Sequence, residues 1–397
     1  MTRIAPLRVT ACTLISAAGT GLAASLDALG ARRSGLRPND FGTAPLETWL
    51  GRVAGIESTS LPARLLGWDS RNNRLAWLGL ESDGFRDAVE AARERYGSAR
   101  VAVVMGTSTA SIGGTEEAYR RLGAHDEFPP DLATPAIHNP HSVGGFVQQA
   151  LDLEGPCVTV ATACSSSAKV FAQAERMIRL GLADAAVVGG VDSLCGSVIH
   201  GFNSLELISP QPCRPFDRDR RGINLGEAAG FALLERDGRT GPWLRGYGES
   251  SDAHHMSSPH PHGHGARVAI RDALARGGLS PDGVAYVNLH GTASIKNDEV
   301  EAAAVAELFP STTLASSTKG WTGHTLGAAG IVEAAIAMLA IEHDFVPGTL
   351  NCENVDPACG PQIVTDNVRR RVDVALSFSF GFGGSNCVLA FSRERAR

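Results

Sequence analysis

The sequence lacks the cysteine spacings that structural zinc sites and disulfide frameworks need. No two of its eight cysteines form a CxxC pair, and they are scattered at positions 12, 157, 164, 195, 213, 352, 359 and 387. A chain of 397 residues can bury a substantial core without such cross-links. We therefore expect free thiols, no metal site and a reducing, cytoplasmic compartment.

Three further absences exclude whole classes of function. The chain has no glycine pattern of the dinucleotide-binding or Walker type. Its formal net charge is −6 and it has no long basic run, which argues against nucleic-acid binding. The best candidate for a membrane span, residues 326–341, is interrupted by Glu333 and is too short. We expect a soluble protein without a membrane span.

Short β-rich runs alternate with helical patterns along the chain. VAVVMG at 101–106 and AAVVGGVD at 185–192 are typical of buried strands. Apolar residues at helical spacing predict one helix from Ser70 to about Arg93. Alternation of this kind indicates a mostly parallel sheet with helices on its faces.

A polar linker, RDGRTGP at 236–242, separates two stretches of this alternation. It follows the strand-like GFALLE and precedes a new run, WLRGYGES. The segments after Cys164 and after His324 are both rich in alanine and apolar on most sides, as in helices buried between two sheets. We therefore predict two related halves, residues 1–238 with the cysteine and residues 239–397 with the histidines described below.

Cys164 is the strongest candidate for a nucleophile. It lies where the apolar run CVTVA at 157–161 passes into a helical pattern, and three serines, 165–167, follow it. The first turn of a helix has free N–H groups, and the positive end of its dipole favours a thiolate. A free cysteine is more commonly a small buried residue. These residues alone leave both interpretations open.

Five motifs occur in a consistent order along most of the chain. They are TACSSS around Cys164, RPFDRDRRGINLGEAAG from Arg214, NLHGTAS around His290, STKGWTGHTLGAAG around Lys319 and His324, and SFGFGGSN from Ser379. Together they resemble the β-ketoacyl-acyl-carrier-protein synthases, the condensing enzymes of fatty-acid and polyketide assembly. The resemblance implies a thiolase-like α/β fold, in which two βαβαβαββ halves pack as five αβαβα layers.

The resemblance also implies a reaction and its residues. A decarboxylative Claisen condensation joins an acyl chain held on Cys164 to malonyl-acyl carrier protein. His290 and His324 would donate hydrogen bonds to the thioester oxygen that gains charge as carbon dioxide leaves. Lys319 would order the histidines, and in the family it is buried and paired with a glutamate that corresponds to Glu301 here.

Other residues of the same motifs correspond to substrate contacts in the family. Phe382 would gate the acyl pocket, its N–H and that of Cys164 forming an oxyanion hole, and Phe380 lies on the same glycine-bracketed loop. Thr292 and Ser294 would bind the phosphopantetheine arm. The chain reads HGTASIKND where the family usually has HGTxTxxGD, so it departs from the pattern at Ser294 and at Asn297.

The implied partner is an acyl carrier protein, which brings the phosphopantetheine, so the chain needs no cofactor of its own. Carrier proteins are acidic and this chain is acidic too, so docking requires a local basic patch. Arg71 and Arg74 lie three apart near a predicted helix start and share one face. They are either that patch or an ordinary solvated face, with the basic group 218–221 as the alternative patch.

The resemblance further implies a homodimer, in which the strand at 157–163 pairs with its copy and covers an exposed sheet edge. A heterodimer with a chain-length partner is the alternative assembly.

Three other functions fit a thiolase-like sequence less well. A degradative thiolase needs a second catalytic cysteine on the C-terminal glycine loop, and Cys387 falls just after that loop. An initiating synthase would have asparagine at the position of His324. A non-catalytic partner subunit would lack the nucleophile. The loop 252–264 carries five histidines, which we interpret as ordinary histidines near a tunnel mouth rather than as a metal site.

Overall fold

The β-rich runs of the first half pair into one mixed sheet. The computed structural model describes residues 3–42, 46–123, 126–132 and 134–395. The strand order is β1-β9-β7-β5-β6. The first two pairings are antiparallel and the last two are parallel. These strands are β1 (Leu7–Ser16), β5 (Val101–Gly106), β6 (Cys157–Val160), β7 (Ala185–Asp192) and β9 (Ala228–Glu235).

The second half repeats this pattern. Its strand order is β10-β16-β15-β11-β12, again with two antiparallel pairings followed by two parallel ones. These strands are β10 (Trp243–Ser251), β11 (Tyr286–Asn288), β12 (Leu314–Ser316), β15 (Val374–Gly381) and β16 (Ser385–Ser392). β1 and β10 pair at Leu7↔Leu244 and Arg8↔Trp243 and so join the two sheets. The repeat agrees with related halves; the boundary at 238/239 stays a prediction.

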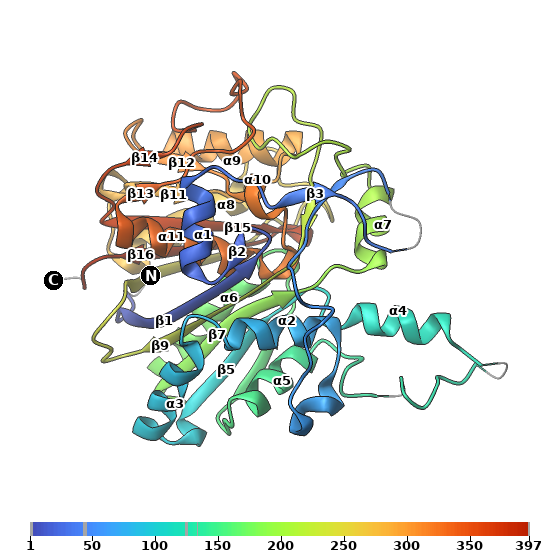
Figure 1. Ribbon diagram of the computed structural model, residues 1–397. Coiled ribbons are helices and arrows are strands. Elements are labelled where there is room, and N and C mark those ends of the chain that lie inside the picture. The colour runs from blue at the N-terminus through green and yellow to red at the C-terminus, as the bar shows by residue number, and fades with distance from the viewer. Residues whose placement is uncertain (1–2, 43–45, 124–125, 133, 396–397) are drawn as a thin grey trace.

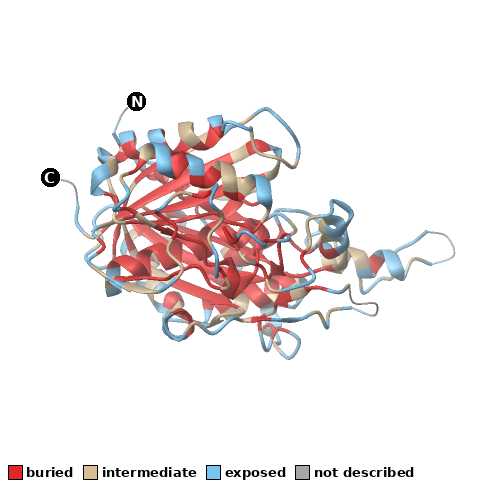
Figure 2. Cartoon of the chain, turned by 90° about the horizontal axis from the view of Figure 1, so that it is seen from above, coloured by how far each residue is buried: buried red, intermediate tan, exposed pale blue. Residues whose placement is uncertain are grey.

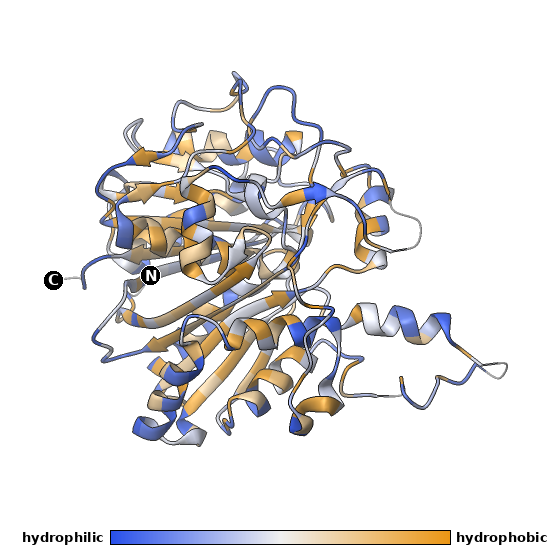
Figure 3. Ribbon diagram, viewed as in Figure 1, coloured by the Kyte–Doolittle hydropathy of each residue, from blue (hydrophilic) through white to orange (hydrophobic). Residues whose placement is uncertain are grey.

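Two helices fill the space between the sheets. α6 (Ser166–Arg179) and α11 (Ala329–His343) contact each other and strands of both halves. Every residue of α11 from Ala329 to Ile341 is buried, which is why its sequence has no polar face (Figures 1 and 3). The segment Leu326–His343 is long and apolar enough to cross a membrane, yet 89% of it is buried inside the protein, as in a core helix.

Further helices cover the outer faces of the sheets. α2 (Arg71–Leu80), α3 (Phe85–Tyr96) and α5 (Ser142–Ala150) pack on the first half, and α8 (His264–Gly277) and α9 (Ile295–Leu308) pack on the second. Figure 2 shows the exposed residues gathered on the outside of these layers, around a buried centre. The arrangement is the five-layer thiolase-like fold that the motifs imply.

The prediction of a single helix from Ser70 to about Arg93 is wrong. The chain leaves α2 at Leu80 and begins α3 at Phe85. Asp83 and Gly84 take positive φ angles of 55° and 66°, a conformation that a helix cannot continue through. The carboxylate of Asp83 accepts the N–H of Leu22 at the start of another helix, α1 (Leu22–Gly30). A tertiary contact thus accompanies the break.

Short elements complete the structure. α4 (Ile112–Arg120) projects from the body of the protein (Figure 1). The others are β2 (Gly19–Thr20), β3 (Leu36–Pro38), β4 (Trp49–Gly51), α7 (Gly196–Ser204), β8 (Leu225–Gly226), α10 (Lys319–Thr322), β13 (Phe345–Val346), β14 (Val368–Arg369) and several 3-10 turns, among them 382–384.

Candidate active site

The motif residues gather where parallel strands end. Cys164 follows β6, His290 follows β11, Lys319 and His324 follow β12, and Phe382 follows β15. Parallel strands in one sheet bring their carboxyl ends to the same edge, where α/β folds place their ligands. The topological repeat brings the corresponding edges of the two halves together at this point.

A sharp turn presents the sulfur of Cys164 to this edge. Ala163 takes a φ of 51°, and α6 then starts at Ser166. Ser166 Oγ accepts the N–H of Thr162 at 2.9 Å and donates to the carbonyl of Ala163 at 2.6 Å, which holds the turn. A Cβ on Gly381 would lie 2.9 Å from the Thr162 carbonyl, so only glycine lets the loop after β15 approach this closely.

The two histidines stand beside the thiol. His324 Nε2 lies 3.0 Å from Cys164 Sγ. The rings of His290 and His324 are 5.3 Å apart and nearly perpendicular, at 87°. All three side chains are buried, and their ligand atoms lie within 4.8 Å of one another. A thiol, a base in contact with it and a second imidazole therefore surround one small volume.

The Lys319 ammonium makes three interactions, two of them with His290. It lies 3.5 Å from His290 Nδ1 and also donates to the His290 carbonyl and to the carboxylate of Glu333. Glu333 in turn accepts a hydrogen bond from Ser379 Oγ at 3.2 Å. An ammonium can only donate, so Nδ1 of His290 accepts and its ring proton sits on Nε2, free to donate to a substrate.

The pairing of Lys319 with Glu301 is wrong, because Glu333 takes that position. The Glu301 carboxylate instead accepts the backbone N–H groups of His290 and Gly291 at 2.6 and 2.7 Å. Burial raises the pKa of Glu301 to about 8, against those two hydrogen bonds. Glu301 is fully buried and does not line the cavity, so it supports the backbone of the His290 loop rather than touching substrate.

Burial determines the resting protonation of the site. It raises the pKa of the Cys164 thiol to about 12, although the charge of Lys319 and the N–H of Phe382 oppose the shift. Burial, reinforced by the charge of Lys319, also lowers the pKa of both His290 and His324. The resting site thus holds a neutral thiol and two neutral imidazoles. Thiolate forms only when His324 takes the proton across the 3.0 Å contact.

The site opens into a cavity of 550 Å³, a volume typical of small-molecule sites. Cys164, His290 and His324 lie in its wall, together with the predicted contacts Thr292, Ser294, Phe380 and Phe382. Motif residues that are more than 200 positions apart therefore share one cavity.

Family models describe both halves of this chain. The model for the N-terminal domain of β-ketoacyl synthase matches residues 74–239, and that for the C-terminal domain matches residues 243–353. A 3-oxoacyl-acyl-carrier-protein synthase 2 from Coxiella burnetii is 31% identical over 97% of this chain and 98% of that protein. The chain belongs to the β-ketoacyl synthase family.

Other β-ketoacyl synthase relatives agree. A mitochondrial 3-oxoacyl-acyl-carrier-protein synthase from Arabidopsis thaliana is 41% identical over 62% of this chain, and the match spans 59% of the plant protein. A solved ketosynthase in complex with its chain length factor, from Xenorhabdus doucetiae, superposes with a TM-score of 0.87 at 35% identity, covering 97% of each chain.

Two features of this β-ketoacyl synthase site were not predicted from the sequence. Glu333 is the partner of Lys319, and its only sequence signal was a single acid within an otherwise apolar stretch. Phe202 on α7 stacks on Phe382 at 5.5 Å between ring centres. Nothing in the sequence around Phe202 distinguishes it from a core aromatic. Phe382 lines the same cavity as Cys164, and the gating role of its ring stays a prediction.

The histidine-rich loop lies at the mouth of this cavity, which Ser257, Ser258 and Pro259 help to line. The ring centres of three of its histidines stand 5.2 to 6.2 Å from that of His260; they are His254, His262 and His264. Within the described residues, the one group whose ligand atoms come within metal-binding range is Cys164, His290 and His324. The positive charge of Lys319, beside His290, would repel a metal ion at this group. The absence of a metal stays a prediction.

Arg71 does not serve as a free docking residue. Its guanidinium binds the Glu227 carboxylate at 2.7 and 3.0 Å and also Glu57 at 2.7 Å. Glu227 is completely buried and accepts two backbone N–H groups besides, from Val53 and Leu194. Arg74 pairs with Asp69 at 2.6 Å, near the surface. The docking assignment of Arg71 is therefore corrected: Arg71 is an internal ion-pair partner, and a docking role for Arg74 stays a prediction.

This difference predicts unequal costs for two similar substitutions. Arg71→Ala leaves Glu227 buried and unpaired, which should cost about 3–5 kcal/mol of unfolding free energy. Arg74→Ala breaks a partly solvated pair and should cost less than about 1 kcal/mol. Urea unfolding of both variants at one protein concentration measures the difference. Equal losses would contradict the internal role of Arg71.

Proposed function

We propose that this protein catalyses the decarboxylative condensation of a Cys164-bound acyl chain with malonyl-acyl carrier protein. The observation that carries the proposal is the contact of His324 Nε2 with Cys164 Sγ at 3.0 Å, with His290 beside it in one cavity. The reaction belongs to fatty-acid, polyene or polyketide assembly. It needs no resident cofactor, because phosphopantetheine arrives on the carrier, and a cytoplasmic location suits the free thiols.

The first half-reaction transfers the acyl group to the enzyme. His324 takes the Cys164 proton as sulfur attacks the acyl thioester, and the carrier thiolate then leaves with that proton. The positive end of α6 stabilises the developing thiolate. The N–H of Phe382, which lowers the pKa of this thiol, and the N–H of Cys164 would hold the oxyanion.

The second half-reaction forms the carbon-carbon bond. The malonyl carboxylate leaves as carbon dioxide, and its bonding electrons pass into an enolate. Both histidines are neutral at this stage. The ring proton of His290 lies on Nε2 and can be donated to the enolate oxygen, and His324 donates in the same way as its Nε2–H tautomer, because the acylated sulfur no longer donates to that nitrogen. The enolate carbon then attacks the acyl-cysteine, the carbon-sulfur bond breaks, and Cys164 leaves as a thiolate. His324 returns a proton to that thiolate and takes its own replacement proton from solvent, so the condensation consumes one proton. The product is a β-ketoacyl carrier protein.

Each of three alternative functions requires features that differ from those of this site. A thiolase would need a second reactive cysteine, and Cys387 is fully buried within β16. An asparagine-type initiating enzyme is excluded by His324, which contacts the thiol. A non-catalytic partner subunit has no use for a buried Cys164–His324 contact or for a second histidine, His290, that Lys319 orients. A catalytic subunit paired with a chain-length partner remains compatible with every one of these contacts.

Substitution of Cys164 tests the two half-reactions separately. Cys164→Ala should abolish condensation, because no group is left to hold the acyl chain. Cys164→Gln should retain malonyl decarboxylation, since the amide resembles the acylated side chain and both histidines remain. Mass spectrometry of the wild type after incubation with acyl carrier protein should show the acyl mass on the peptide of Cys164. An acyl group elsewhere, or condensation by the alanine variant, would refute the mechanism.

The carrier protein should approach the mouth of the cavity. Arg221 and Lys296 line this mouth and are exposed. Arg220, beside them, is not available, because it is buried with Asp298 and Asp356. The mouth also carries Glu206 and Asp252, so the attraction comes from two cations rather than from a broad basic face. Such rim charges act mainly on the rate of association.

Charge reversal at the mouth should therefore discriminate between substrates. The double variant R221E/K296E should raise KM for acyl carrier protein about tenfold at low ionic strength, with little effect on acylation by a small thioester. The double variant R33E/R37E reverses two exposed arginines elsewhere and is the matched control. Equal losses with both substrates would place the damage in the cavity instead.

We also propose that β6 forms the dimer interface with a second copy. All four residues of β6 are half-exposed, and the strand lies at the edge of its sheet. The opposite edge is covered, because Ala315 of β12 exchanges hydrogen bonds with Gln362 and Val364. Exposed apolar side chains on the projecting α4 and the loop after it add contact area: Ile112, Tyr119 and Phe128. An uncovered edge beside apolar surface favours pairing.

The wild type should sediment as a dimer at micromolar concentration. Val103 and Thr107 donate to the carbonyls of Pro156 and Val160, so the backbone N–H of Thr159 points to the open edge. Thr159→Pro removes that donor and should shift the protein toward monomer while circular dichroism stays unchanged. A wild-type monomer would contradict the homodimer, and formation of a dimer only with a chain-length partner would establish the heterodimer.

A further inference from the structure

A hollow lined by five arginines lies far from the catalytic cavity. Its volume is 540 Å³, within the range of small-molecule sites. The lining arginines are Arg3, Arg245, Arg276, Arg371 and Arg395. On β16, Asn386 lines the catalytic cavity and Ser392 lines this hollow, so about 20 Å of strand separates the two. We call it the arginine hollow.

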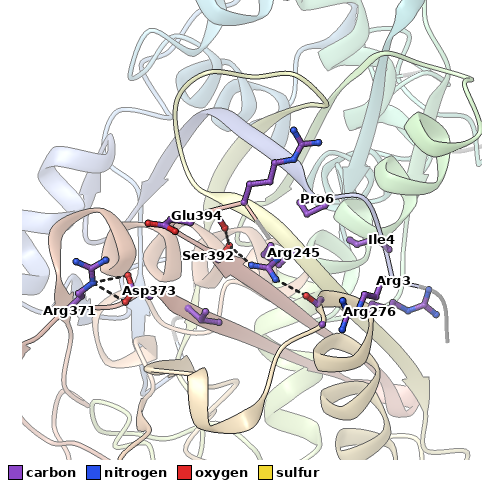
Figure 4. A pocket seen from close by; sticks show the side chains of 13 residues that line it. Arg3, Ile4, Pro6, Arg245, Arg276, Arg371, Asp373, Ser392 and Glu394 are labelled. Atoms are coloured by element: carbon purple, nitrogen blue, oxygen red, sulfur yellow. Dashed lines mark hydrogen bonds and ion pairs between the residues drawn. The ribbon is translucent and has the colours of Figure 1, made fainter. Parts of the chain in front are cut away.

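Three different parts of the fold build the arginine hollow. They are the segment before β1, the end of α8 with the start of β10, and the ends of β15 and β16 that face away from the catalytic cavity. In Figure 4, Arg245 lies at the centre, with Arg3 and Arg276 on one side and the Arg371–Asp373 pair on the other. The arginines that line the hollow thus come from separate elements of the fold.

The charges of the arginine hollow do not balance. Two carboxylates, Asp373 and Glu394, line it alongside the five arginines. Asp373 is bound to Arg371 at 2.9 Å, and Arg276 is bound at 3.0 Å to Asp272, outside the hollow. Among the described residues, neither Arg3 nor Arg395 has a carboxylate partner, and neither does Arg245.

Arg245 is the least satisfied of these cations. It donates to the carbonyl of Gly277 at 2.9 Å and to Ser392 Oγ at 3.5 Å, while its Nε is buried without a hydrogen-bond partner among the described residues. Burial and the nearby charge of Arg3 lower the pKa of Arg245. A half-buried guanidinium in this situation gains from an anion beside it.

We propose that the arginine hollow binds a small anion with more than one phosphate group. A guanidinium fork pairs with two phosphate oxygens, and Arg3, Arg245 and Arg395 together supply the charge that a diphosphate requires. The lining residues that the structure describes include no aromatic side chain, and nearby Trp243 already stacks with Arg8 and Arg395. The hollow would therefore recognise the phosphate groups of its ligand and not a nucleobase stacked on an aromatic ring.

Calorimetry with inorganic pyrophosphate at low ionic strength tests the arginine hollow. One pyrophosphate should bind per chain, and R3Q/R395Q should weaken its binding at least about tenfold because two phosphate ligands are lost. Both residues are exposed, so the fold should survive, and unchanged labelling of Cys164 by iodoacetamide verifies it. R245Q should weaken binding as well.

The matched control is R33Q/R37Q, which removes the same charge from exposed positions outside the hollow and should change the affinity less than about twofold. Absence of pyrophosphate binding would overturn the proposal. Equal weakening in the two double variants would overturn it too, because the effect would then be general electrostatics. Malonate binding as tightly as pyrophosphate would overturn the phosphate assignment. None of these outcomes depends on the condensation chemistry.

Discussion

A single buried ion pair, Lys319 with Glu333, orders the catalytic site. Both side chains are only 3% exposed, and an ammonium in such a place is costly unless every donor has a partner. The Lys319 ammonium has three, namely the Glu333 carboxylate, the His290 carbonyl and His290 Nδ1. The pair joins α10 to α11 and directs the Nε2–H of the His290 ring toward substrate. Burial, together with this positive charge, lowers the pKa of both imidazoles and keeps them neutral, which their role as hydrogen-bond donors demands.

The packing of two helices between two sheets supplies the rest of the geometry. α6 starts just after Cys164 and α11 starts just after the loop of His324, and the two helices contact each other. A Cβ on Gly330 would lie 2.5 Å from the Ala168 backbone nitrogen, so the helix starts approach at backbone distance. Asp192, at the end of β7, accepts N–H groups from Ser108 in the first half and Gly327 in the second. The halves are therefore locked together beside the nucleophile.

Local sequence patterns predicted the secondary structure correctly where burial alone decides it. The strands at 101–106 and 185–192 lie where the β-branched runs predict them, because both faces of each strand are buried. The prediction of one long helix after Ser70 failed because Asp83 and Gly84 have positive φ angles, and the spacing of apolar residues does not reveal such a turn. The docking prediction for Arg71 failed for another reason. The spacing of Arg71 and Arg74 correctly placed both on one helix, but Glu227, more than 150 positions later, decides that Arg71 turns inward.

The sequence by itself determined the chemistry of this protein: one thiol at a strand-to-helix turn, two histidines in glycine-flanked loops and a lysine, in the order that the β-ketoacyl synthases share. These are local features, because a turn, a helix start and a motif are encoded within a few residues. Only the tertiary structure decided which carboxylate neutralises Lys319, that the thiol rests protonated beside His324, and which arginines are free. Burial and partners determine all three, and both arise from contacts between segments far apart in the chain.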